Sequence, residues 1–257
     1  MVSFNNEELL SFLNFKSQQY ESLAFIETDP ILIPHQFNDQ KDIEIMAFLM
    51  ATIAWGNRNS IIKSGERLID FFDNAPYDFI MNAKDTEINK LNSFVHRTFN
   101  GQDLICFVQN LKALYEEQNS LEFYFLNEKK EKHLQFSISR FKSTFFSKAP
   151  LQRTFKHIAD PLNKSAAKRI NLFLRWMVRP NDKGVDFGIW KRIDKSLLSI
   201  PLDVHSGRVA RKLKLLNRKQ NDHLAVMELD KALRNLDPKD PVKFDFALFG
   251  LGVFEQF

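Results

Sequence analysis

The helical spacing of the apolar residues limits the fold of this chain more than any other feature. Apolar side chains recur every three or four positions, as in Ile170, Phe173 and Met177, and this is the spacing of one face of an α-helix. Runs that alternate apolar and polar residues are nearly absent, and only 8 of the 257 residues are glycine. The sequence therefore predicts an all-α protein.

Prolines, glycines and polar turns separate the predicted helices. A helix that starts at Asp39 or Asp42 and continues to Ile53 is apolar on nearly all sides, which predicts a buried central position. A polar loop is expected at residues 127–132 and a turn at 180–184, and no single linker separates two domains. The predicted helices lie at about residues 11–20, 43–53, 60–72, 101–117, 136–146, 165–179, 185–193, 203–216, 224–233 and 242–251.

Composition excludes several classes of protein. With 44% hydrophobic and 26% charged residues, a chain of this length buries a core of its own, so disorder is not expected. The single cysteine, Cys106, rules out a disulfide framework, a multi-cysteine zinc site and a Cys-ligated iron–sulfur cluster within this chain. The 6 histidines show no metal-binding spacing and no glycine-rich nucleotide loop is present, so we expect no metal and no cofactor.

Two further patterns bear on location. Residues 1–8 contain neither a basic stretch nor a long apolar one, so no secretory signal is expected. The longest apolar run, residues 46–55, is about half of what a bilayer span requires. We expect a soluble cytoplasmic protein, associated with the nucleoid, that has no membrane partner.

Charge is unevenly distributed along the chain. Between residues 152 and 219 there are 17 Lys and Arg against 5 Asp, a local balance of +12, while the whole chain carries +4 and the remainder therefore carries −8. Such a segment is what a polyanion-binding surface would contain, because each neutralised phosphate releases counterions. Solvated helix faces that happen to carry Lys and Arg explain the charge equally well.

Asp203 lies where a helix is expected to begin, directly after Ile200-Pro201-Leu202. Aspartate is a favoured N-cap because its carboxylate accepts hydrogen bonds from the free N–H groups of the first turn, and this alone explains its position. In the alternative interpretation the helix N-terminus keeps the carboxylate ionised, and the carboxylate faces a cleft and stabilises a developing positive charge. The spacing alone favours the cap.

Lys168 is expected at the start of another helix, beside Arg169 and after the small residues Ser165, Ala166 and Ala167. The positive end of the helix dipole, a neighbouring guanidinium and partial burial would together lower the pKa of its amine, as a nucleophilic lysine requires. An exposed lysine with an ordinary amine is the simpler interpretation.

Two segments carry a resemblance to a known superfamily. Residues 200–213, IPLDVHSGRVARKL, resemble the catalytic-aspartate segment of the helix-hairpin-helix DNA glycosylases, which include endonuclease III and the 8-oxoguanine glycosylases. The family pattern there is an apolar lead-in, a V-D-x-H-like core and then R-V-x-x-R-L. Residues 162–168, LNKSAAK, are similar in frame to the L-P-G-x-G-x-K hairpin, whose final lysine is the nucleophile of the bifunctional enzymes. Lys164 and Ala166 stand where the family pattern has glycine.

The resemblance implies a fold and a set of roles. The fold would be a single helix-hairpin-helix unit of two interleaved helical lobes, lobe A about residues 1–40 plus 150–257 and lobe B about 41–149, with a basic cleft between them. Lys168 would attack C1′ of a flipped nucleotide, and Asp203 would stabilise the oxocarbenium-like charge. The separation of these two residues is similar to that in the archaeal 8-oxoguanine glycosylases.

The resemblance also suggests residues that contact DNA. His205 could reach a phosphate or Asp203, and Asn57, in the polar loop after an apolar helix, could fill the place of the extruded nucleotide. An ordinary loop asparagine explains Asn57 better. Trp55, Trp176 or Trp190 could stack on the extruded base, although aromatic residues at such spacings more often belong to the core. The residues expected to bind backbone phosphates are Arg169, Arg175, Arg179, Arg208, Arg211 and Lys212.

Over its whole length the chain also resembles an uncharacterised bacterial family of unknown function, notably at residues 175–179 and 244–252. We therefore expect a DNA repair glycosylase, with associated lyase activity, that excises a damaged base from double-stranded DNA. One alternative is a non-catalytic DNA- or RNA-binding protein that keeps the fold with a degenerate hairpin. Another is a regulatory protein whose basic surface meets an acidic partner. The damaged base and the oligomeric state stay open.

Overall fold

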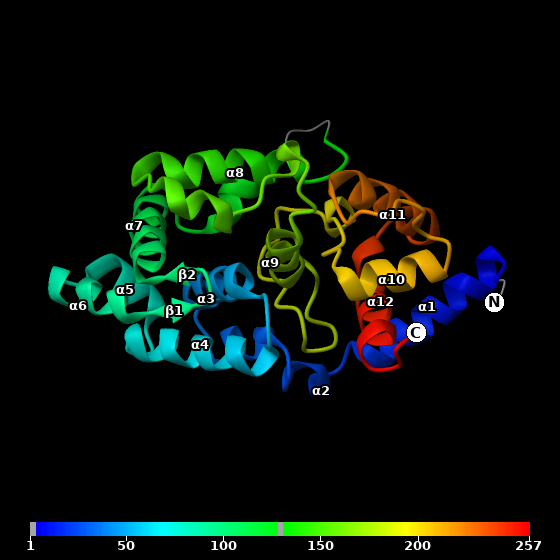
Figure 1. Ribbon diagram of the computed structural model, residues 1–257, viewed down its shortest axis with the longest axis horizontal. Coiled ribbons are helices and arrows are strands. Elements are labelled where there is room, and N and C mark those ends of the chain that lie inside the picture. The colour runs from blue at the N-terminus through cyan, green and yellow to red at the C-terminus, as the bar shows by residue number, and fades with distance from the viewer. Residues whose placement is uncertain (1–3, 128–130) are drawn as a thin grey trace. The chain divides into compact units, whose positions relative to one another are not determined.

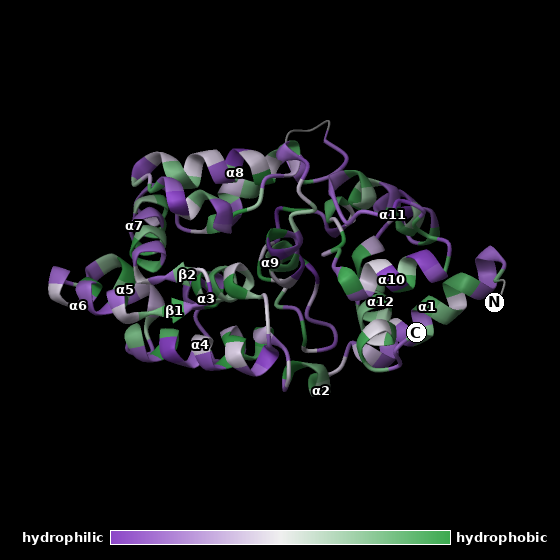
Figure 2. Cartoon of the chain, viewed as in Figure 1, coloured by the Kyte–Doolittle hydropathy of each residue, from purple (hydrophilic) through white to green (hydrophobic). Residues whose placement is uncertain are grey.

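The computed structural model describes residues 4–127 and 131–257, and these are mostly helical (Figure 1). The prediction of a mostly helical chain is confirmed. Within the described ranges the only sheet is an antiparallel pair of two-residue strands, in which Val95 pairs with Asn100 and His96 with Phe99. Most helices carry hydrophobic residues next to hydrophilic ones, as expected for helices with one buried face (Figure 2).

The chain divides into two compact units, each of which is formed by segments that are not contiguous in the sequence. Unit 1 contains residues 1–25, 127–136 and 160–257, and unit 2 contains residues 26–126 and 137–159. Compared with the predicted lobe A, unit 1 lacks residues 26–40 and 150–159 and includes residues 127–136. That the fold contains a basic cleft stays a prediction.

Unit 2 is built around α3. Every residue of α3 from Ile43 to Ile53 is buried, which confirms the predicted central helix, and Asp39 caps its N-terminus by accepting from the N–H groups of Lys41 and Asp42. The ring of Phe48 lies 5.5–5.6 Å from three other phenylalanine rings. The elements of unit 2 are α3 (Gln40–Ile53), α4 (Arg58–Phe71), α5 (Pro76–Asn82), α6 (Asp85–Lys90), β1 (Val95–His96), β2 (Phe99–Asn100), α7 (Gly101–Glu117) and most of α8 (Gln135–Lys148).

Unit 1 is organised around its C-terminal helix. This helix is apolar on almost every side and packs against both the first helix of the chain and the helix that follows Asp203. The elements of unit 1 are α1 (Asn6–Tyr20), most of α2 (Leu23–Ile26), the start of α8, α9 (Lys168–Val178), α10 (Val204–Lys212), α11 (His223–Leu236) and α12 (Phe244–Val253).

The prediction of a helix at residues 185–193 is wrong. This segment is irregular, and its amides bond to the end of α9 instead of forming a helix of their own: the N–H of Phe187 donates to the Trp176 carbonyl at 2.8 Å, and that of Trp190 to the Met177 carbonyl at 2.9 Å. Gly188 has a positive φ of 56° and lies against the backbone of residues 179–180, so the chain turns where the apolar pattern suggested a continuing helix.

Other differences are smaller. The helix predicted from residue 165 begins at Lys168, because Ala167 adopts a left-handed conformation with φ of 47°. The hairpin at residues 95–100 and the short helices α5 and α6 were not predicted, since elements of this length leave little periodicity to recognise. The predicted polar loop at 127–132 includes residues 128–130, which lie outside the described residues.

Candidate functional site

The fold brings together the two residues that the sequence singled out. Lys168 is the first residue of α9 and Asp203 is the N-cap of α10. Both belong to unit 1, and Lys168 Nζ lies 3.1 Å from Asp203 Oδ2. The lysine side chain keeps 36% of its surface exposed and the aspartate side chain 12%, so the pair is reachable from solvent on the side of the amine.

Asp203 serves as both the predicted cap and the partner of Lys168. Its Oδ1 accepts from the N–H of Ser206 at 2.9 Å, and the Ser206 hydroxyl accepts from the N–H of Asp203, which completes a capping box. Burial disfavours the charged carboxyl, but the nearby Lys168 ammonium and the Ser206 hydrogen bonds outweigh this effect, so the pKa of Asp203 is lowered from its ordinary value. The two interpretations of Asp203 are therefore compatible, because different oxygens of one carboxylate make the two contacts.

A hairpin presents Lys168. A 3₁₀ turn at residues 161–163 leads into Lys164, which has a left-handed backbone with φ of 67°, and Ala167 is left-handed as well. Glycine adopts this conformation most readily, and Lys164 is one of the two positions where the superfamily pattern has glycine. At Ala166, the other such position, φ is not positive. The chain thus makes a hairpin turn here without glycine.

A second carboxylate, which the sequence analysis missed, lies close to this pair. Asp245 on α12 is buried and pairs with Arg175. Burial raises the pKa of Asp245 to about 6, an effect opposed by Arg175 and Lys168 and assisted by the negative charge of Asp203. The one signal for Asp245 in the sequence is that it interrupts the apolar stretch of residues 244–252, where a charged side chain is buried only when it is paired.

Arg175 and Arg179 are not available to DNA phosphates, which corrects the prediction. Their exposed fractions are 2% and 4%. Arg175 pairs with Asp186 and Asp245, and Arg179 pairs with Glu21, Asp186 and Asp240. Arg175 lies on the buried face of α9, Arg179 directly follows the last residue of this helix, and both hold together segments of unit 1.

The other residues expected to contact DNA differ in how exposed they are to solvent. Arg169 is partly exposed, and burial lowers the pKa of its guanidinium to about 10. His205, Arg208 and Lys212 are exposed on α10, although an Arg208 nitrogen also donates to the Gly252 carbonyl at 2.7 Å. The guanidinium of Arg211 instead donates hydrogen bonds within unit 1, to the carbonyls of Arg218 and Gln220 and to the side chain of Asn221.

The residues expected to contact the extruded base or to fill its place in the duplex are buried or have other partners. Trp176 and Trp190 are fully buried in unit 1, so neither can stack on a base. Trp55 is partly exposed in unit 2, where its ring packs against His96 and His157. Asn57, also in unit 2, is the N-cap of α4 and accepts from the N–H of Ser60 at 3.2 Å, which agrees with the simpler interpretation.

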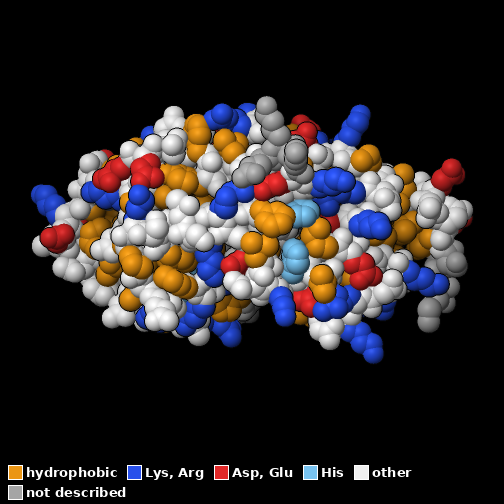
Figure 3. All heavy atoms as spheres, turned by 90° about the horizontal axis from the view of Figure 1, so that it is seen from above, with side chains coloured by type: hydrophobic (Ala, Val, Ile, Leu, Met, Phe, Trp, Pro, Cys, Tyr) orange, Lys and Arg blue, Asp and Glu red, His pale blue; other side chains and the backbone are white. Residues whose placement is uncertain are grey.

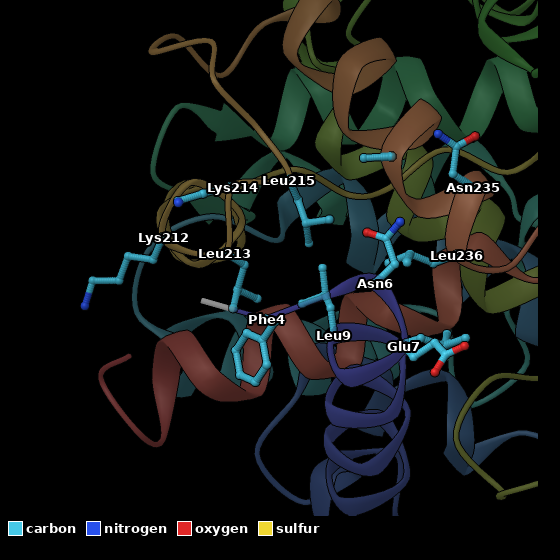
Figure 4. A pocket seen from close by; sticks show the side chains of 12 residues that line it. Phe4, Asn6, Glu7, Leu9, Lys212, Leu213, Lys214, Leu215, Asn235 and Leu236 are labelled. Carbon is cyan, nitrogen blue, oxygen red and sulfur yellow. The ribbon is translucent and has the colours of Figure 1, made fainter. Parts of the chain in front are cut away.

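One cavity of unit 1 is separate from this pair. It has a volume of about 460 Å³ and lies among α1, the end of α10 and α11. Leu9, Leu213 and Leu215 point toward its centre, whereas Lys212 and Lys214 point away (Figure 4). Neither Lys168 nor Asp203 lines it, so we assign it no part in their chemistry.

On the face seen in Figure 3, Lys and Arg side chains are interspersed with Asp and Glu and do not form one patch. Among residues 4–127 and 131–257, no group of three or more His, Cys, Asp or Glu side chains is arranged to hold a metal ion. In the same ranges no helix has the length and apolar character needed to cross a membrane.

Comparisons with known proteins identify a family for this chain. No curated protein and no solved structure matches the sequence. Residues 29–254 match a family model described as a protein of unknown function, DUF2400. Because this match covers most of both units, the chain belongs to that family.

Proposed function

We propose that this protein is a DNA repair glycosylase of helix-hairpin-helix type, with associated lyase activity, and that Lys168 is its nucleophile. The observation that carries the proposal is the 3.1 Å contact between Lys168 Nζ and Asp203 Oδ2, since these residues are 35 positions apart in the sequence (203 − 168). The turn at Lys164 supports it, because the chain adopts a left-handed conformation at a glycine position of the superfamily hairpin.

The chemistry requires a proton to move within the pair. A lysine in an ion pair is protonated and cannot attack, so one proton must leave Nζ, and Asp203 Oδ2 is an acceptor within reach. As the Nζ–C1′ bond forms, the bond from C1′ to the base breaks and the base leaves with a proton. Transfer of a second proton from Nζ to O4′, with cleavage of the C1′–O4′ bond, opens the sugar ring and gives a protonated Schiff base. Loss of a C2′ proton then expels the 3′ phosphate by β-elimination.

Strand cleavage of damaged duplexes tests the proposal. The substrates are oligonucleotide duplexes that each contain one 8-oxoguanine, uracil, oxidised pyrimidine or abasic site. We expect cleavage at one or more of these lesions, and we expect Lys168→Ala to reduce the rate by at least 10²-fold, because general-base assistance cannot replace a missing nucleophile. Lys164→Ala, which removes an exposed lysine of the same hairpin, is the matched control and should keep cleavage within a few-fold.

A non-catalytic nucleic-acid-binding protein is the second candidate, favoured by the absence of glycine from the hairpin. Such a protein would bind duplex DNA with strong salt dependence and would leave every lesion intact. Binding without cleavage would therefore refute the glycosylase and support this candidate. Cleavage that survives in Lys168→Ala would refute the assigned nucleophile.

A further inference from the structure

The chain segment between α10 and α11, residues 213–222, contacts both parts of the chain that deliver the Lys168–Asp203 pair. Asn221 Nδ2 donates to the backbone carbonyl of Asp203 at 2.8 Å. Immediately after this segment, the N–H of His223 donates to the carbonyl of Lys164 at 3.1 Å. Ser165 and Asp222 also form an isolated antiparallel bridge. One short segment therefore contacts both the backbone of Asp203 and the hairpin that carries Lys168.

The orientation of Asn221 is fixed by a guanidinium. An Arg211 nitrogen donates to Asn221 Oδ1 at 2.7 Å. Arginine is a donor and never an acceptor, so the amide oxygen of Asn221 must face Arg211 and its NH₂ group must face the Asp203 carbonyl. Arg211 is itself held by the Arg218 carbonyl, to which its Nε donates at 2.8 Å.

The helix backbone leaves room for this contact at a glycine. A Cβ on Gly207 would lie 2.8 Å from Asn221 Oδ1 and 2.9 Å from an Arg211 nitrogen, which is closer than real Cβ contacts come. Gly207 thus allows the amide and the guanidinium to pack directly on the first turn of α10, the turn that Asp203 caps.

We propose that Asn221, oriented by Arg211, is a positioning residue that holds Asp203 in place opposite Lys168. Asn221 does not touch the reacting atoms. It fixes the backbone of Asp203, and the backbone fixes the direction of the carboxylate. Arg211 then acts through Asn221 and not on a phosphate. The catalytic meaning of this role rests on the proposed function, whereas the positioning itself does not.

The test measures the titration of Asp203 by carbon NMR, using protein labelled at the aspartate carboxyl carbons and assigned with Asp203→Asn. In the unaltered protein the Asp203 pKa should lie below its ordinary value. Asn221→Ala and Asn221→Leu should both raise it toward that value, since a loosened cap would move the carboxylate away from the Lys168 ammonium. The Leu variant keeps the approximate size of the side chain and adds no charge but has no NH₂ donor, so it isolates the contact to the Asp203 carbonyl.

Asn217→Ala is the matched control, because Asn217 is an exposed asparagine of the same segment. It should leave the Asp203 titration unchanged. An unchanged titration in a folded Asn221 variant would overturn the inference. If Asn221→Ala does not fold, as judged by far-ultraviolet circular dichroism, the Leu variant decides.

Turnover separates this inference from the proposed function. If damaged DNA is cleaved, Asn221→Ala should lower kcat about tenfold or more with KM little changed, because a small displacement of a catalytic group is costly. If no lesion is cleaved, the proposed function fails, while the Asp203 titration still decides the positioning role.

Discussion

Two sets of charges on α9 differ in their exposure, and this difference decides what each residue can do. Lys168 keeps a third of its side chain in solvent, whereas Arg175 is enclosed with its carboxylate partners. Breaking a buried ion pair leaves a charge without compensation, which is costly. The pair formed by Lys168 is reachable from solvent, whereas the pairs formed by Arg175 hold the helix in place.

Asp245 should make the protein less stable as pH rises from 4 to 6. Its pKa in the folded chain is about 6, above that of an unfolded aspartate, so the folded state binds more protons in this range. Stability is therefore fully present below the unfolded pKa and falls as pH rises toward 6, by about 3 kcal/mol in total. Asp245→Asn mimics the neutral acid and should lack this fall.

Urea unfolding at pH 4, 5, 6 and 7 measures the effect. The unfolding free energy of the unaltered protein, taken relative to that of Asp245→Asn, should decrease from pH 4 to pH 6 and then level off. Parallel pH profiles for the two proteins would show that Asp245 ionises normally in the folded state and that the account of its burial is wrong.

The sequence singled out Lys168 and Asp203 by their positions at the starts of predicted helices, and the resemblance of their neighbours to a known motif suggested their roles. Arg175 and Arg179 were assigned to phosphates because a local sequence does not reveal which face of α9 is buried. That face is set by distant carboxylates such as Glu21 and Asp240. Asp245 and Asn221 were missed for the same reason, since their roles depend on partners far away in the chain.

At the scale of elements, the strongly periodic helices were predictable and the segments that bond to other elements were not. The bounds predicted for α7 match the structure. Residues 185–193 have an apolar pattern but satisfy their amides on the carbonyls of α9, and no local pattern shows such a partner. The hairpin before α9 was recognised from its frame, although its left-handed residues are Lys164 and Ala167.

Lys164→Gly should stabilise the protein. A residue with a Cβ is strained at φ of 67°, and glycine relieves about 1–2 kcal/mol of this strain while it adds less than that in unfolded-state entropy. The expected gain in unfolding free energy is about 0.5–1 kcal/mol by urea titration. Lys219→Gly, at an exposed position without positive φ, should instead lose a comparable amount. A loss at Lys164 equal to that at Lys219 would mean that the hairpin is not strained.

Gly250→Ala should destabilise the packing of α12 against α1. A Cβ at this position would lie 2.1 Å from the ring of Tyr20, and an aromatic ring cannot give way cheaply, so we expect a loss of about 1–3 kcal/mol. Thermal or urea unfolding measures it. Adding Tyr20→Leu, which removes the obstructing ring edge, should recover part of the loss. Strictly additive effects of the two substitutions would contradict this contact.

At the scale of the whole molecule, most of the basic character of residues 152–219 remains at the surface. Of its 17 Lys and Arg side chains, Arg175 and Arg179 are buried and neutralised inside unit 1, and the others are at least partly exposed. On the face seen in Figure 3, Lys and Arg side chains are interspersed with Asp and Glu. Affinity for DNA should therefore come from individual exposed cations of this segment and not from one continuous basic patch on that face.

Lys212→Ala should weaken duplex binding and reduce its salt dependence. Lys212 is exposed on α10, and loss of one phosphate contact lowers the magnitude of the slope of log K against log salt by about 1. Fluorescence anisotropy at several salt concentrations measures the slope. Lys90→Ala, an exposed lysine of unit 2, should leave it unchanged. Equal effects of the two substitutions would argue against a defined contact on α10.

The proposal that Lys168 attacks C1′ is tested most directly by covalent trapping. Duplex DNA with one abasic site is incubated with the protein and sodium borohydride, which reduces a Schiff base to a stable amine, and the modified peptide is located by mass spectrometry. We predict one adduct, on Lys168, and none in Lys168→Ala. An adduct on Lys164, a spread over many surface lysines, or no adduct at all would contradict the central claim.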